Sequence, residues 1–322
     1  MYLPFENLGP EAILAALESV GLEPNGGLLA LNSYENRVYQ AQTEGLEFYV
    51  VKFYRPGRWT YEAIEEEHNF SYELLDSDIS VVAPIQIDGS TIFDFAGYHF
   101  AIFQRQGGHP PNLENENDLA VLSRSIARIH AIGAKKPFAH REIFSIDRLG
   151  TASREFILNS DFLPPELIES YAATTQILLD CIEPTMIESQ QIRIHGDCHM
   201  GNVLWRNDIS HFVDFDDCLN GPPIQDLWML LSGERQEQLH QINTILDAYN
   251  EFYEFSPSSL AAIEPLRTLR MIHHSAWIGK RWDDPAFPLA FPFFSSAKYW
   301  SDHILSLREQ ESKLSEEPLY YL

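Results

Sequence analysis

The sequence predicts an α+β fold of two lobes, a small antiparallel β-sheet lobe with one long helix and a larger, mostly α-helical lobe. Three observations predict it. Short runs rich in β-branched and aromatic residues recur between residues 27 and 54, separated by turn sequences. One long amphipathic helical pattern follows over residues 60–75. After a Gly- and Pro-rich linker at about residues 104–111, apolar residues recur at three- and four-residue steps.

The first lobe is expected to hold a short helix, a meander of strands and the long helix. Pro10, at a first helical position, begins the short helix. Thr60 can cap the long helix, which runs to about Leu75. Two more strands are expected after it, joined by the turn signal Asp88-Gly89. In chain order, the five expected strands cover residues 27–32, 37–42, 46–54, 81–88 and 98–105.

The second lobe is expected to be helical except for one stretch. Its first helix carries an apolar face made of Leu119, Leu122, Ile126, Ile129 and Ile132. Further helical segments are expected over residues 165–186, 222–254, 258–282 and 296–314. Residues 192–216 break this pattern with short strands or loops. We expect the lobes to divide into residues 1–106 and 107–322.

The composition excludes several classes of protein. Of the 322 residues, 47 are acidic and 22 basic, so the formal net charge of −25 repels the phosphates of nucleic acids. The three cysteines are too few and too widely spaced for a disulfide framework or a Cys-x-x-Cys zinc site. The N-terminus does not resemble a secretory signal, and no apolar run approaches the ~20 residues that span a bilayer. We expect a cytoplasmic monomer with no nucleic-acid or membrane partner.

Residues 193–217, RIHGDCHMGNVLWRNDISHFVDFDD, concentrate the titratable side chains. His195, Asp197 and His199 alternate, so on an extended strand all three would lie on one face and could bind zinc or iron. The glycines in and after this run favour a loop instead, and no nearby His/Glu pair supplies further ligands. A metal-dependent hydrolase is therefore the weaker alternative.

Phosphoryl transfer accounts for more of these residues. It needs a carboxylate that orients and deprotonates the acceptor hydroxyl, and Mg²⁺ held by hard oxygen ligands. Asn202 follows Asp197 by five positions, the Asp-x-x-x-x-Asn spacing of a kinase catalytic loop. Asp214 lies twelve residues after Asn202, directly after an apolar pair that indicates the end of a strand. A kinase site has its second metal-binding carboxylate at this place. A hairpin would bring Asn202 and Asp214 to one metal ion.

A kinase-type site also needs a lysine on the third strand, and Lys52 lies there inside YVVKFY. Its neighbours are apolar, and a strongly hydrated charge in such a place needs a partner. On the projection of the following helix, Glu67 falls within the apolar face and Glu66 at its edge. We expect Glu67 to pair with Lys52, with Glu66 as the alternative. Taken alone, such a pair could equally be a structural ion pair.

HGDCHMGNVLWR followed by FVDFDD resembles the signature of the aminoglycoside phosphotransferase and choline kinase branch of the protein-kinase-like fold. With LNSYENRVYQ, VVKFYRPGRWT, NGPPIQDLWMLL and RWDDPAFP, the chain is similar to the bacterial stress response kinase A (YihE/RdoA) family over about residues 28–300. The resemblance implies a bilobal kinase-like fold with an ATP-binding N-lobe. It also implies an ATP- and Mg²⁺-dependent Ser/Thr protein kinase that phosphorylates itself and counters stress-induced cell death.

Carried over residue by residue, the resemblance makes Asp197 the catalytic base. Asn202 and Asp214 would hold Mg²⁺, Lys52 would bind the ATP phosphates, and Ser33 would lie over them. Asp226 would hydrogen-bond the backbone of the catalytic loop. Apart from the resemblance, we expect His195 to hydrogen-bond loop backbone rather than to react.

Three features depart from eukaryotic protein kinases. No glycine-rich loop precedes Lys52, since SYENRVY contains no glycine, so the amides of turn 34–36 must assist Ser33. His199 stands where many Ser/Thr kinases carry a lysine, so the positive charge near the γ-phosphate is reduced or depends on pH. Only twelve residues separate Asp214 from Asp226, which leaves no room for a long activation segment.

The signature does not distinguish a kinase of proteins from a kinase of small molecules, because both need the same ATP chemistry. A kinase acting on an amino alcohol, homoserine or an aminoglycoside is the main alternative, and an inactive ATP-binding scaffold is a weaker one. Asp283 and Asp284 could line an acidic acceptor groove or lie in a solvated loop. Support, turn or solvated positions are expected for Asp208, His211, Asp216 and Asp217.

Overall fold

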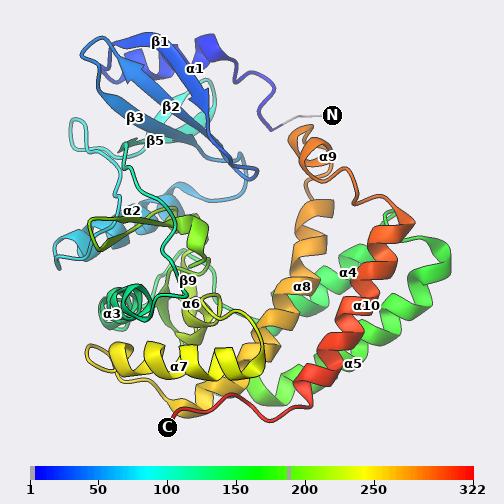
Figure 1. The fold of residues 1–322 in the computed structure, drawn as a ribbon. Coiled ribbons are helices and arrows are strands. Elements are labelled where there is room, and N and C mark those ends of the chain that lie inside the picture. The colour runs from blue at the N-terminus through cyan, green and yellow to red at the C-terminus, as the bar shows by residue number, and fades with distance from the viewer. Residues whose placement is uncertain (1–3, 187–189) are drawn as a thin grey trace.

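The computed structural model describes residues 4–186 and 190–322, which form two lobes (Figure 1). The first lobe is built on a five-stranded antiparallel sheet with the strand order β1-β2-β3-β5-β4. Its strands are β1 (Pro24–Ala30), β2 (Arg37–Thr43), β3 (Phe48–Phe53), β4 (Phe93–Phe95) and β5 (Tyr98–Gln104). The expected three-strand meander is therefore confirmed.

Helices lie on both faces of this sheet. On one face, α1 (Pro10–Ser19) buries Ile13 and Leu17 in a small core with Val51 of β3. On the other face lies α2 (Tyr61–Leu75), which begins at the expected cap, where Thr60 Oγ1 accepts a hydrogen bond from the Ala63 amide at 3.2 Å. Figure 1 shows α2 between the sheet and the second lobe. The carboxylates of α2 can therefore face both lobes.

The strand expected over residues 81–88 is wrong. In the described chain this segment makes only isolated bridges, and β4 takes the edge of the sheet after the turn at residues 88–89. Pro84 has no N–H to donate, so a regular ladder cannot run through it. The segment instead reaches the second lobe, since the Val82 amide donates to the Phe212 carbonyl at 2.9 Å.

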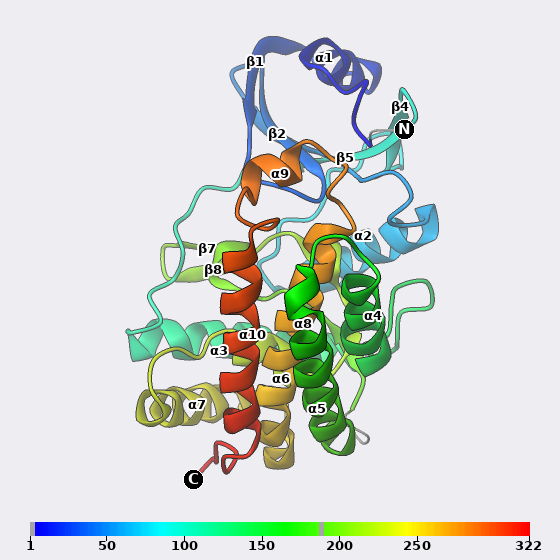
Figure 2. The same ribbon diagram turned by 90° about the vertical axis from the view of Figure 1, so that its right-hand side faces the viewer.

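The second lobe is mainly helical (Figure 2). Its helices are α3 (Glu116–Gly133), α4 (Ala152–Leu158), α5 (Ile168–Met186), α6 (Ile224–Trp228), α7 (Arg235–Tyr249), α8 (Ile263–Gly279), α9 (Ala286–Ala290) and α10 (Ala297–Leu314). The expected segments are confirmed as helical, but residues 222–254 divide into α6 and α7, with Gly233 between them at φ 78°. The helices α4 and α9 were not expected, because seven and five residues are too short to show a period. No helix of the described chain is both long and apolar enough to span a bilayer.

Four short strands interrupt the helices. Three lie within residues 192–216, as expected, and the fourth, which was not expected, follows them. They are β6 (Ile192–Ile194), β7 (Val203–Arg206), β8 (Ile209–Phe212) and β9 (Leu219–Gly221). β6 pairs with β9 and β7 pairs with β8, both antiparallel. One core joins this region to the first lobe, because Phe70 and Leu74 of α2 pack in the same cluster as Phe215 and Leu122. The loops between these strands are thereby held against α2.

Candidate active site

The loop that carries Asp197 is held by Asp226 of α6. The two oxygens of this carboxylate accept hydrogen bonds from the backbone amides of His195 and Gly196, both at 2.8 Å. Asp226 is 1% exposed, and its Oδ2 also lies 3.1 Å from His130 Nε2. Hydrogen bonds from backbone amides take the place of water around such a buried carboxylate. The start of the loop is therefore fixed to α6.

Asn202 and Asp214 flank the β7–β8 hairpin. The Val213 amide donates to the Asn202 carbonyl at 3.0 Å, so the hairpin brings the two predicted metal ligands to the same end. Asn202 Nδ2 donates to the Asp197 carbonyl at 2.9 Å, which orients the amide group and turns its oxygen away from the loop. Asp214 has left-handed backbone angles, φ 57° and ψ 65°, and its carboxylate is 52% exposed.

Lys52 lies among three carboxylates. Its Nζ is 3.3 Å from Glu67 Oε1, 3.0 Å from Asp214 Oδ1 and 3.1 Å from Asp216 Oδ1. Burial by itself lowers the pKa of Lys52, but the three carboxylates outweigh burial and raise the pKa well above its usual value. The ammonium therefore stays charged and joins β3, α2 and the segment after β8 at one point.

Glu67, rather than Glu66, is the carboxylate beside Lys52. It is 3% exposed, and burial raises its pKa while Lys52 opposes that rise. Glu66 points elsewhere and accepts hydrogen bonds from the backbone amides of residues 139–141 at 2.7, 2.7 and 3.0 Å. The two neighbouring glutamates thus serve different partners, one the lysine and the other a loop of the second lobe.

Asp216, expected at a support, turn or solvated position, is a buried support of Lys52. Only 3% of it is exposed, and Arg58 and Lys52 both pair with it. Burial raises the pKa of Asp216, but Arg58 and then Lys52 outweigh burial and lower it. The left-handed residue Asp214 changes the direction of the chain just before Asp216. Asp217 also pairs with Arg58, at 2.5 Å.

Asp197 has two basic neighbours, one of which the sequence did not reveal. Its Oδ1 accepts a hydrogen bond from Arg270 Nη1 of α8 at 2.8 Å, and its Oδ2 lies 3.4 Å from His199 Nε2. Burial raises the pKa of Asp197, but Arg270 and then His199 outweigh burial and lower it. No spacing rule could connect Arg270 with a residue 73 positions earlier. The other ring nitrogen of His199 accepts from the Gly201 amide at 2.9 Å, which holds the imidazole in place.

Ser33 stands apart from the other predicted residues, in the turn between β1 and β2. Its Oγ donates to the Asn36 carbonyl at 3.2 Å and closes the turn on itself. Within the part of the chain that the structure describes, it makes no hydrogen bond with Lys52, Asp197 or Asp214. The position of this turn depends on other contacts.

The donors at this site suit a hard divalent cation better than zinc. Asn202 and Asp214 offer amide and carboxylate oxygens, and Mg²⁺ takes such ligands together with waters and phosphates. The His195 ring does not converge with Asp197 and His199, because its Nε2 lies 2.9 Å from the Val213 carbonyl. Among the described residues, no three His, Cys, Asp or Glu side chains are grouped to hold a metal ion. A zinc-type hydrolase site is not formed by these residues.

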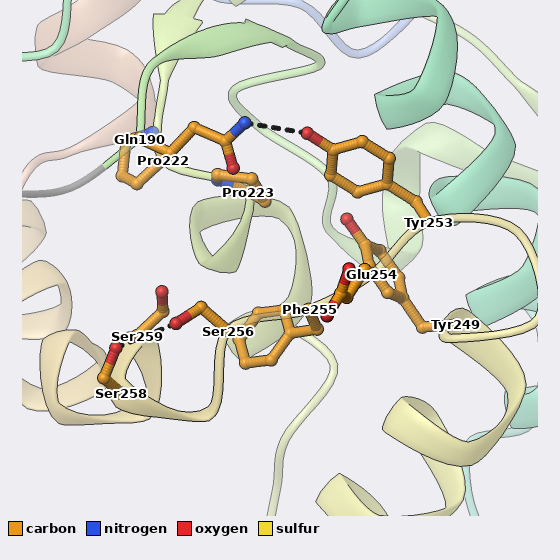
Figure 3. Close-up of a pocket in the computed structure, with 10 residues that line it drawn as sticks. All are labelled: Gln190, Pro222, Pro223, Tyr249, Tyr253, Glu254, Phe255, Ser256, Ser258 and Ser259. Carbon is orange, nitrogen blue, oxygen red and sulfur yellow. Dashed lines mark hydrogen bonds between the residues drawn. The ribbon is translucent and has the colours of Figure 1, made fainter.

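A cavity of about 190 Å³ lies elsewhere in the second lobe (Figure 3). Pro222, Pro223 and the segment from Tyr249 to Ser259 line it, and Gln190 Nε2 donates across it to the Tyr253 hydroxyl at 2.9 Å. None of the predicted site residues lines this cavity. It is not part of the site built around Lys52 and Asp197.

The chain matches known proteins along nearly its whole length. Residues 28–263 match the model of the phosphotransferase enzyme family. The chain is 41% identical over 316 residues to stress response kinase A of Salmonella choleraesuis (strain SC-B67), covering 98% of this chain and 96% of that protein. Serine/threonine protein kinase RdoA of Salmonella typhimurium (strain LT2) is also 41% identical, with the same coverage. Stress response kinase A of Escherichia coli (strain K12) is 40% identical, again with 98% and 96% coverage.

Solved structures share the fold at low identity. Amicoumacin kinase hAmiN superimposes with a TM-score of 0.73 at 18% identity, covering 96% of this chain and 94% of that one. A microcompartment-associated aminopropanol kinase superimposes with a TM-score of 0.68 at 17% identity, covering 93% of this chain and 95% of that one. The bilobal kinase-like fold is therefore confirmed. The chain belongs to the phosphotransferase enzyme family, within the group of stress response kinase A proteins, and is a kinase.

Proposed function

We propose that the protein is an ATP- and Mg²⁺-dependent Ser/Thr protein kinase that also phosphorylates itself. It would act in the cytoplasm, as a monomer, in a bacterial stress response that counters stress-induced cell death. One observation carries the proposal. The Lys52 ammonium lies between Glu67 and Asp214, at the end of the hairpin that also carries Asn202. Relatives at 40–41% identity that are named kinases support it.

The nucleotide would lie between an N-lobe of residues 1–106 and a C-lobe of residues 107–322. Lys52 would bind the phosphates, since its ammonium is charged and held in place by carboxylates of both lobes. Asn202 and Asp214 would hold Mg²⁺, which neutralises the charge of the phosphates during transfer. Ser33 and the amides of its turn would cover the phosphates.

Asp197 would orient the acceptor hydroxyl and take its proton. As the hydroxyl oxygen forms its bond to the γ-phosphorus, the bond from that phosphorus to the bridging oxygen of ADP breaks. The proton passes to Asp197 and from there to water. Arg270 lowers the pKa of Asp197, so the carboxylate is ionised at neutral pH. The Asp197 side chain is 23% exposed, and Arg270 bonds its Oδ1, so Oδ2 would be the oxygen that meets the acceptor.

A small-molecule acceptor is the second candidate. Two of the structurally similar proteins are named as kinases of amicoumacin and aminopropanol. The charge beside Asp197 disfavours an aminoglycoside, because the Arg270 guanidinium, 2.8 Å from Asp197 Oδ1, would repel an ammonium group placed next to the acceptor hydroxyl.

The deciding experiment offers labelled ATP to the purified protein and to Asp197→Asn. Generic protein acceptors are tested in parallel with homoserine, amino alcohols and aminoglycosides. We expect label on the protein itself and on a protein acceptor, lost in Asp197→Asn by at least about 100-fold because a positioned general base contributes that much. Label found on a small molecule alone contradicts a protein acceptor, and no label on any acceptor contradicts both candidates.

A further inference from the structure

The turn between β1 and β2 is tied to the C-terminal part of the other lobe. Glu35 of this turn accepts a hydrogen bond from Trp277 Nε1 at 2.7 Å and pairs with Arg281 at 2.5 Å. The ring of Tyr34 packs on Phe291, with 5.2 Å between the ring centroids. Figures 1 and 2 both show α9 rising beyond the end of α8 to the level of β2.

Asp284 makes the reverse connection, from the second lobe to the first. It lies between α8 and α9 and is 2% exposed. Its Oδ1 is 2.7 Å from Arg37, and its Oδ2 is 2.5 Å from Arg55, which also pairs with Glu35 at 3.0 Å. The expectation that Asp284 lines an acceptor groove or a solvated loop is therefore wrong, because ion pairs between the lobes engage its charge.

The same two arginines bond two backbone carbonyls and one side chain of the turn. Arg55 Nε donates to the Glu35 carbonyl at 2.9 Å, its amide donates to Asn36 Oδ1 at 3.0 Å, and Arg37 Nη1 donates to the Tyr34 carbonyl at 3.2 Å. In a trans peptide the C=O and the N–H point in opposite directions, so the next amides point away from the arginines. Within the described chain, the amides of the turn from residue 34 to 36 donate no hydrogen bond.

We propose that this clamp positions the β1–β2 turn to bind the triphosphate. The clamp is the set of ion pairs formed by Glu35 and Asp284 with Arg37, Arg55 and Arg281. The clamp replaces the glycine-rich loop of other kinases. The turn contains no glycine, so its backbone is less free to adapt to a ligand. Its unpaired amides can therefore donate to phosphate oxygens only in the direction in which the clamp holds them. Fixing the turn beforehand removes an ordering cost from nucleotide binding. This inference deepens the proposed function and rests on it.

The burial of the clamp distinguishes it from a passing surface contact. The side chains of Arg55 and Glu35 are 9% and 11% exposed, and that of Asp284 is 2% exposed. Separating a buried ion pair leaves each charge without water or a partner, so such pairs resist opening. The turn therefore keeps its place relative to α8 while the nucleotide binds and leaves.

Two variants test the clamp against one matched control. Asp284→Asn keeps the volume of the side chain and removes its charge. Trp277→Phe removes the hydrogen bond to Glu35 and part of the ring that packs on Phe287 and Phe291. Glu73→Gln is the control, because Glu73 of α2 also joins the lobes, at 2.7 Å from each of two basic side chains, but does not touch the turn. For each variant, the KM for ATP, the KM for the acceptor, kcat, the melting temperature and amide hydrogen exchange are measured on the whole chain.

We expect Asp284→Asn to raise the KM for ATP about tenfold, the usual effect of one hydrogen bond to a charged group. Trp277→Phe should raise it less, and the KM for the acceptor should not change. Exchange of the Arg55 amide, which donates to Asn36 Oδ1 of the turn, should become faster in both variants and stay unchanged in Glu73→Gln. If the clamp variants and the control alter the KM for ATP equally, or if exchange of the Arg55 amide is unchanged, the clamp has no positioning role. Failure of Lys52→Met to weaken ATP binding would instead overturn the proposed function.

Discussion

Replacing the buried Asp226 by asparagine should loosen the catalytic loop. The carboxylate accepts two backbone hydrogen bonds at 2.8 Å and is 1% exposed, so no water can replace it. Asparagine keeps one acceptor oxygen, and its NH₂ group meets the other donor. One bond to a charged group, about 1.5–3 kcal/mol, is lost and the other weakens by about 1 kcal/mol. We expect a loss of roughly 3 kcal/mol in the free energy of unfolding.

The assay separates stability from positioning. At roughly 2 °C per kcal/mol for a chain of this size, the melting temperature of Asp226→Asn should fall by about 6 °C. Since a displacement of about 1 Å can lower a rate about 100-fold, kcat measured far below the melting temperature should fall by about 10- to 100-fold. Amide exchange at residues 195 and 196 should become faster, because these two amides lose their acceptors.

Asp302→Asn is the matched control, because Asp302 lies exposed on α10. It should change neither the melting temperature nor kcat. If Asp226→Asn behaves like this control, the loop is not held by the carboxylate. A fall in melting temperature with unchanged kcat would show that Asp226 stabilises the lobe without positioning the loop.

Three further predictions follow from the contacts and pKa shifts. Arg270→Ala removes the cation that lowers the pKa of Asp197, so that pKa rises and the acidic limb of the kcat/KM profile moves to higher pH. Arg270→Lys keeps a positive charge and should shift the acidic limb less. If Arg270→Ala leaves the acidic limb where it is, Arg270 does not control the pKa of Asp197. Glu67→Gln should raise the KM for ATP about tenfold because Lys52 loses a charged partner. The fold should tolerate this change, since burial already disfavours the charge of Glu67, and an unchanged KM would argue against the pair. A thiol reagent should label Cys181 alone in the native protein and all three cysteines after denaturation, because the other two are buried with raised pKa values. Labelling of a second thiol in the native protein would be the contrary result.

Local sequence was enough to predict the parts of the site that lie on single elements. The spacing from Asp197 to Asn202 lies within one loop, and the hairpin that follows returns the chain to Asp214. The pairing of Lys52 with Glu67 could also be predicted, because strand and helix periods determine which side chains face the interior. In the structure, the strand places Lys52 and the helix places Glu67 toward each other, at 3.3 Å.

The strand expected at residues 81–88 shows where local rules fail. The run of apolar residues predicts a strand, but Pro84 has no N–H to donate, and the described segment makes only isolated bridges. One residue that cannot join the ladder therefore makes such a prediction wrong for the residues around it.

The sequence by itself determined the two-lobed α+β class, the loop with Asp197 and the lysine on the third strand, since each depends on neighbours in the chain. Only the tertiary structure brought Arg270 to Asp197 and Asp284 to Arg37, across 73 and 247 positions. No periodicity connects residues so far apart. Their contacts exist because the helices of the second lobe pack in one arrangement, and that packing depends on the shape of the whole core.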